Sequence, residues 1–269
     1  MIRATELSKL YENHLAVSGL SFQLDPGDIC GLVGPNGAGK TTTMRCLAGL
    51  IPATDGELVV AGRRVGRQDL ELKQLVAYVP DDPPLFDDLS VGQHLEFVGR
   101  LYGVAEYATR AAELLTQFEL TDKRDCGATT LSRGMRQKLA ICCAYLFRPQ
   151  VLLLDEPLTG LDPPGIRALL GSVRDYARTG ATVIISSHLL AMIDDICTHL
   201  LVMKRGTGKY FGSAADLRER FPQARTLEEA YFAATDGRQP SPEEAGSSTS
   251  SLPSIALAAN ASATTELLT

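Results

Sequence analysis

The stretch Gly34-Pro35-Asn36-Gly37-Ala38-Gly39-Lys40-Thr41 decides the fold of this chain of 269 residues. It follows the strand-like run 28–33 and precedes the helical pattern 41–50, so it satisfies GxxxxGK[ST] in the strand–loop–helix setting that this pattern requires. Glycines let the backbone curl so that its N–H groups face a phosphate, at the start of a helix whose dipole also favours an anion. Lys40 supplies a positive charge for the β- and γ-phosphates, and the Thr41 hydroxyl is the expected Mg²⁺ ligand. The predicted nucleotide-binding residues of this segment are Gly34, Pro35, Asn36, Gly37, Ala38, Gly39, Lys40, Thr41 and Thr42.

A second acidic site stands at the end of another apolar run, Val151-Leu152-Leu153-Leu154-Asp155-Glu156. Four hydrophobic residues predict a strand buried beside the phosphate loop, and parallel sheets bind their ligands at the carboxyl ends of their strands. Asp155 is therefore expected to hold Mg²⁺ through water. Glu156 is expected to orient or deprotonate the water that attacks the γ-phosphate.

The remaining pattern predicts an α/β fold with a mainly parallel sheet. Near-continuous apolar runs, typical of strands covered on both faces, occur at 29–34, 151–155 and 182–186. Segments with alternation or turn signals, expected to be antiparallel strands at one edge, are 1–7, 17–25 and 57–65. Between about 89 and 148 the β-branched runs give way to helical patterns, which predicts a helical insertion.

One further motif narrows the class of nucleotide hydrolase. In Leu131-Ser132-Arg133-Gly134-Met135-Arg136-Gln137-Lys138-Leu139, Ser132 is a plausible N-cap and Gly134 permits close backbone approach. This helix would therefore offer free N–H groups to an anion, as the phosphate loop does. Two such helix ends from different parts of one chain cannot serve one nucleotide without a partner, so the motif indicates a head-to-tail dimer.

Taken together, these motifs resemble those of the ATP-binding cassette (ABC) ATPases over roughly residues 1–235. The motifs that carry the resemblance, in order along the chain, are GPNGAGKT (34–41), LSRGMRQKL (131–139), VLLLDEP (151–157), TGLDP (159–163) and SSH (186–188). The resemblance implies a RecA-like P-loop NTPase core with an antiparallel β-subdomain and a helical subdomain. It also implies two ATP molecules, each held between the phosphate loop of one protomer and residues such as Ser132 and Gly134 of the other.

The resemblance assigns roles to three further residues. Tyr11 is similar to the aromatic residue that stacks on adenine in this family. His188 resembles the histidine that contacts the γ-phosphate and the region of the catalytic water. Asp162 resembles an aspartate that communicates across the dimer, and it is also a suitable N-cap before Pro163 and Pro164.

Two departures from the family pattern stand out. After Tyr78-Val79-Pro80 the family has glutamine, and this chain has Asp81, which we expect to be a third metal-site residue beside Thr41 and Asp155. Its negative charge near Asp155 and Glu156 would change the affinity for the metal. In the 131–139 motif, Arg133 and Met135 replace the usual Gly and Gln, while Ser132 and Gly134 are kept.

The resemblance implies a subunit that dimerises, hydrolyses ATP with Mg²⁺ and drives a separate membrane permease, with export favoured by similarity of 78–103 and 227–235 to bacterial exporter ATPases. The second protomer could be a copy of this chain or a related one. The alternative is a soluble ABC ATPase serving iron–sulfur cluster assembly, translation or DNA repair. One cassette without sustained heptads argues against the translation and repair classes.

Composition constrains location and partners. The formal net charge of −6 argues against a nucleic-acid partner, which requires clustered positive charge. No apolar run is long enough to span a bilayer, and the amino-terminal residues lack a signal peptide, so we expect a peripheral protein at the cytoplasmic face of the membrane. Residues 236–269, rich in Ser, Thr, Ala and Pro, are expected to be a disordered tail after an ATPase domain of residues 1–235.

Overall fold

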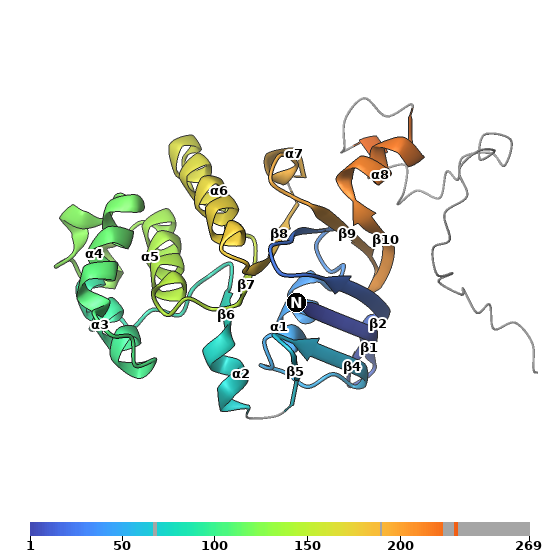
Figure 1. Cartoon of the computed structure of the whole chain (residues 1–269), viewed down its shortest axis with the longest axis horizontal. Helices are drawn as coiled ribbons and strands as arrows, with labels where there is room; N and C mark the ends of the chain where they lie inside the picture. Colours follow the sequence, from blue (N-terminus) through green and yellow to red (C-terminus); the bar gives the residue numbers. More distant parts are fainter. Residues whose placement is uncertain (67–68, 189, 223–228, 231–269) are drawn as a thin grey trace, which may run out of the picture. The chain divides into compact units, whose positions relative to one another are not determined.

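The computed structural model describes residues 1–66, 69–188, 190–222 and 229–230. A six-stranded sheet with the order β10-β9-β3-β8-β7-β6 forms its centre (Figure 1). The strands are β3 (Ile29–Val33), β6 (Val76–Val79), β7 (Val151–Leu154), β8 (Thr182–Ser187), β9 (His199–Lys204) and β10 (Thr207–Ser213). All neighbouring pairs are parallel except β9 and β10, so the predicted parallel sheet is confirmed, with one antiparallel edge strand added.

The antiparallel strands are not an edge of the parallel sheet but form a sheet of their own, which confirms the antiparallel β-subdomain that the family resemblance implies. Its order is β2-β1-β4-β5, from β1 (Ile2–Tyr11), β2 (His14–Leu24), β4 (Asp55–Val60) and β5 (Arg63–Arg64). The alternating side chains explain the difference, because one face, including Leu7, Val17 and Phe22, packs into a core shared with Cys30 and Leu32 of β3. A strand pattern of this kind buries one face against a neighbouring layer.

A second core covers the other face of the parallel sheet. Ile29 and Val33 of β3 face it, as do Leu152 and Leu154 of β7, whereas Leu153 faces the first core. Burial on both faces is why the central strands are near-continuous runs of hydrophobic residues. The helices that surround these sheets are α1 (Lys40–Leu47), α2 (Leu70–Leu75), α6 (Pro163–Arg178), α7 (Leu190–Ile193) and α8 (Ala214–Arg220).

The predicted helical insertion is confirmed. It contains α3 (Val91–Leu101), α4 (Tyr107–Gln117) and α5 (Arg133–Leu146), with short 3-10 turns at Thr121–Lys123 and Ala128–Thr130, and its helices gather beside one end of the sheet (Figure 1). Ser90 begins α3 with a capping box, its hydroxyl accepting from the Gln93 N–H while the Gln93 side chain accepts from the Ser90 N–H. None of the helices in the described ranges is both long and apolar enough to cross a lipid bilayer.

The carboxyl-terminal predictions fall largely outside the described residues. The proposed tail 236–269 lies wholly beyond them. Of the predicted helix 227–235, the structure describes Glu229 and Ala230, which are helical. Ala230 is buried in the second core. The boundary between domain and tail therefore stays a prediction.

Candidate functional site

The phosphate loop occupies the turn between β3 and α1, and its glycines are required by geometry. A Cβ on Gly34 would lie 2.4 Å from the carbonyl oxygen of Met203, and one on Gly39 would lie 2.6 Å from that of Ala16. Gly37 and Gly39 have φ values of 77° and 103°, in the left-handed region that favours glycine. Gly39 is also the N-cap of α1 and provides no side-chain cap, so the first N–H groups of this helix have no side chain of the N-cap residue as a partner.

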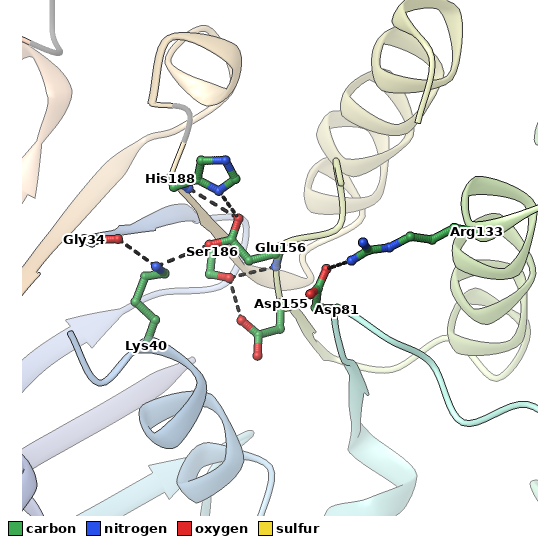
Figure 2. A network of polar contacts seen from close by, with 8 residues as sticks. All are labelled: Gly34, Lys40, Asp81, Arg133, Asp155, Glu156, Ser186 and His188. Carbon is green, nitrogen blue, oxygen red and sulfur yellow. Dashed lines mark hydrogen bonds and ion pairs between the residues drawn. The ribbon is translucent and has the colours of Figure 1, made fainter. Parts of the chain in front are cut away.

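Lys40 is buried and lies between the loop and the acidic strand end. Its Nζ donates to the Gly34 carbonyl oxygen at 2.7 Å and lies 3.3 Å from Oε1 of Glu156 (Figure 2). The loop and the end of β7 therefore converge on one point. This contact joins the two motifs that the sequence places far apart.

Asp155, directly after β7, is a buried carboxylate held by two hydroxyl donors. It is 2% exposed, and its oxygens accept from Ser186 Oγ at 2.7 Å and from the Tyr78 hydroxyl at 3.1 Å. Burial and the neighbouring Asp155 raise the pKa of Tyr78 to about 12, so the phenol keeps its proton and remains a donor at neutral pH. The two hydroxyl donors hold the carboxylate at the carboxyl end of β7.

Glu156 has an unusual backbone conformation that directs its side chain away from Asp155. Its φ is 48°, which is uncommon for a residue other than glycine and is a feature of functional sites. Its N–H donates to Ser186 Oγ at 2.8 Å, and its Oε2 lies 2.9 Å from Nδ1 of His188. Ser186 in β8 thus holds both adjacent acids, and His188, just beyond the strand, orients the second (Figure 2).

A cavity of about 450 Å³ lies between the antiparallel sheet, the phosphate loop and these acids, within the range of small-molecule sites. It is lined by Tyr11, His14, Ala16, Pro35, Asn36, Gly37, Ala38, Gly39, Lys40, Thr41, Thr42, Asp81, Asp155 and Glu156. Gly34 and His188 border this group through their contacts with Lys40 and Glu156. Tyr11 is 40% exposed at the end of β1, a position suited to a stacking surface.

Asp81 lines the same cavity, but its carboxylate is paired with Arg133, a residue that also departs from the family pattern. Its Oδ1 accepts from Arg133 Nη2 at 2.8 Å, across the gap between the loop after β6 and the start of α5 (Figure 2). The metal role predicted for Asp81 therefore has to accommodate this ion pair. One carboxylate oxygen makes the contact.

Three predicted residues lie apart from the cavity lining. Ser132 caps α5, accepting from the Met135 N–H, and Asp162 caps α6, accepting from the Gly165 N–H with prolines in the first turn, as the sequence predicts. Gly134 is buried, and a Cβ there would lie 2.5 Å from the Gly160 carbonyl oxygen. Close packing against the loop before α6 thus explains why a glycine occupies position 134.

Sequence reasoning missed Ser186, Tyr78 and His14 as individual site residues. Ser186 belongs to the SSH motif and Tyr78 to the segment before Asp81, but only the tertiary structure brings their hydroxyls to Asp155. His14 pairs with Tyr11 across the turn between β1 and β2. The turn itself was the available signal, because it brings both residues into the lining of the cavity.

The residues present fit a nucleotide with Mg²⁺. The loop offers uncapped N–H groups and Lys40 to phosphate oxygens, and the buried Asp155 faces the same cavity as Thr41. In the part of the chain that the structure describes, no trio of His, Cys, Asp or Glu side chains is arranged for a metal. Mg²⁺ is usually held in proteins by one or two carboxylates together with substrate phosphates and waters.

Comparison with known proteins shows the family. The model of the family described as ABC transporter matches residues 17–159. The chain belongs to the ABC transporter family. As an ABC-type ATPase domain, it has the P-loop NTPase fold predicted from its motifs.

Individual relatives place the chain among ATP-binding subunits. It is 34% identical over 222 residues to the linearmycin resistance ATP-binding protein LnrL of Bacillus subtilis (strain 168), covering 82% of this chain and 71% of the relative. It is 34% identical over 208 residues to the Nod factor export ATP-binding protein I of Cupriavidus metallidurans, covering 77% and 69%. A solved ATP-binding subunit of an ABC transporter superposes with a TM-score of 0.83 at 32% identity, covering 87% of this chain and 99% of that one.

Proposed function

We propose that this chain is the ATP-hydrolysing subunit of an exporter, that it dimerises, and that it drives a separate membrane permease. The observation that carries the proposal is the placement of Glu156 between Lys40 and His188, in the lining of a cavity that the phosphate loop also lines. The names of two relatives, a linearmycin resistance protein and a Nod factor export protein, support export.

The chain's own residues divide the work of hydrolysis. The loop N–H groups and Lys40 bind the β- and γ-phosphates, and Tyr11 stacks on the base. Glu156 accepts the proton of the attacking water, while His188 holds its carboxylate in position through the 2.9 Å contact. If Mg²⁺ were bound, Thr41 and Asp155 would hold it and it would neutralise charge that develops on the phosphates, while the Asp81 carboxylate is engaged by Arg133.

The position of the α5 amino terminus supports the proposed dimerisation. Ser132 and Gly134 do not line the cavity of their own chain, so N–H groups at this helix start would serve a nucleotide held by a second chain. That chain is a second copy or a related ATPase. The site is complete only when the two are joined head to tail.

A groove between the loop after β6 and the helical insertion is the proposed docking surface for the permease. Its volume is about 240 Å³, and Phe86 and Phe97, 54% and 44% exposed, meet edge to face at its rim. The Phe86 N–H donates to His94 Nε2 at 3.0 Å, which fixes the loop over the groove. Exposed aromatic side chains of this kind mark protein–protein contacts. Docking there would hold the protein at the cytoplasmic face of the membrane.

The test is Glu156→Gln, which keeps the shape of the side chain and removes its basicity. Expected are ATP binding at wild-type affinity, a dimer that persists with ATP in analytical ultracentrifugation, and loss of steady-state hydrolysis. A Glu156→Gln variant that hydrolyses ATP at the wild-type rate would remove Glu156 from the proposed role. For transport, co-purification with a membrane protein of about six spans encoded next to this gene is expected, and Phe86→Ala should weaken it without changing ATP affinity.

A further inference from the structure

Three side chains on one face of α5 donate hydrogen bonds to the loop that follows β6. Arg133 Nη2 donates to Asp81 Oδ1, Arg136 Nη2 to the Pro83 carbonyl oxygen at 3.5 Å, and Gln137 Nε2 to the Pro80 carbonyl oxygen at 3.4 Å. Residues three and four apart lie on one side of a helix, so these donors form a continuous row. The backbone on both sides of Asp81 is therefore held, and its carboxylate has a defined place.

Arg133 is itself confined. A Cβ built on Gly160 would lie 3.2 Å from Arg133 Cδ, which places the aliphatic stem of the arginine along the loop before α6. The guanidinium then reaches Asp81 at 2.8 Å, with the two side chains 52% and 47% exposed. Arg133 begins the helix that the proposed dimer presents to a second chain, but its charge is directed to its own chain's cavity rim.

The charges around the cavity explain what this contact does. Among its lining residues, all of which the structure describes, Asp81, Asp155 and Glu156 are acids and Lys40 is the single Lys or Arg. A polyphosphate would add several negative charges to this set. An unpaired carboxylate at Asp81 would repel it, and the repulsion between like charges a few ångströms apart is reduced when one of them is paired.

We propose that Arg133 is a positioning residue for nucleotide binding in its own chain. It holds the Asp81 carboxylate at the rim and offsets its charge, so that the cavity accepts a polyphosphate. The proposal rests on the proposed nucleotide site and adds a residue that acts there through Asp81. It also explains why two positions that both depart from the family pattern contact each other.

The test is a double-mutant cycle read by nucleotide binding. Arg133→Met, Asp81→Asn and the double variant are titrated with MgADP by calorimetry, at concentrations where sedimentation shows monomer. Arg133→Met should weaken binding by about fivefold, the upper range for an exposed charge pair. In the Asp81→Asn background the same substitution should change it by less than about twofold, because the cycle isolates the pairwise effect.

Three controls distinguish an effect of the Arg133 charge from a structural effect of replacing its side chain. Arg133→Lys should bind MgADP within about twofold of wild type, and the effect of Arg133→Met should shrink as salt rises, since screening weakens exposed pairs. Arg136→Met, which removes a neighbouring arginine bound to a carbonyl group rather than a carboxylate, should weaken MgADP binding by clearly less than Arg133→Met does. Thermal melts of each variant establish that it is folded.

The outcomes also distinguish this inference from the function on which it rests. If Lys40→Ala binds MgADP as tightly as wild type, the nucleotide site itself is wrong. If Lys40→Ala loses binding and Arg133→Met weakens it equally with and without the Asp81→Asn substitution, the site stands and the role of Arg133 through Asp81 is refuted. Equal losses from Arg133→Met and Arg136→Met would refute it as well.

Discussion

Replacing Ser186 with alanine tests how the two adjacent acids are held. The hydroxyl, which is buried, donates to Asp155 Oδ1 at 2.7 Å and accepts from the Glu156 N–H at 2.8 Å. A hydrogen bond to a charged group contributes about 1.5–3 kcal/mol and a neutral one about 0.5–1.5 kcal/mol. Ser186→Ala should therefore lower the free energy of unfolding by about 2–4 kcal/mol, since the buried Asp155 carboxylate and the part-buried Glu156 N–H both lose this contact.

The same substitution should impair catalysis more than binding. Glu156 loses the contact that fixes its left-handed backbone, so its carboxylate no longer lies steadily between Lys40 and His188. We expect kcat for ATP hydrolysis to fall by about tenfold or more, a change of about 1.4 kcal/mol in the activation free energy. ATP affinity, set chiefly by the loop, should change by less than about threefold.

Ser172→Ala is the matched control. Ser172 is a buried serine in α6 whose hydroxyl donates to the Leu169 carbonyl oxygen and contacts the Tyr145 hydroxyl, both neutral partners. Urea unfolding should show a smaller loss, about 1–2 kcal/mol. Hydrolysis per folded molecule should be unchanged. If Ser186→Ala costs no more stability than Ser172→Ala, or keeps the wild-type kcat, the bridging role of Ser186 is wrong.

Three other predictions follow from the same geometry. Gly39→Ala places a Cβ 2.6 Å from a carbonyl oxygen and should abolish ATP binding in calorimetry, whereas Gly37→Ala, with open space around its Cβ, should cost only about 1 kcal/mol of stability from its positive φ. Because the pKa of Tyr78 is raised to about 12 in the fold, the unfolded chain releases this proton first, so stability should fall between about pH 10 and 12 and fall less in Tyr78→Phe. Deleting 236–269 should leave hydrolysis and the melting temperature intact, and a large loss of either would show that these residues belong to the domain.

The local elements of this fold were predictable because their signals lie within short windows. The phosphate loop has glycines whose φ values and close approaches admit little else, and the apolar run of β7 is buried on both faces. The caps formed by Ser132 and Asp162 follow from hydroxyl and carboxylate chemistry at helix starts. Each depends on neighbours a few residues away.

Long-range contacts were decided by the tertiary structure. Sequence alone did not indicate that Ser186 joins Asp155 to the Glu156 backbone or that Arg133 reaches Asp81. No periodicity encodes which hydroxyl meets which carboxylate across a sheet, because that depends on register and packing of segments far apart in the chain. The sequence therefore determined the chemistry available to this protein, and only the folded chain decided which charges offset one another.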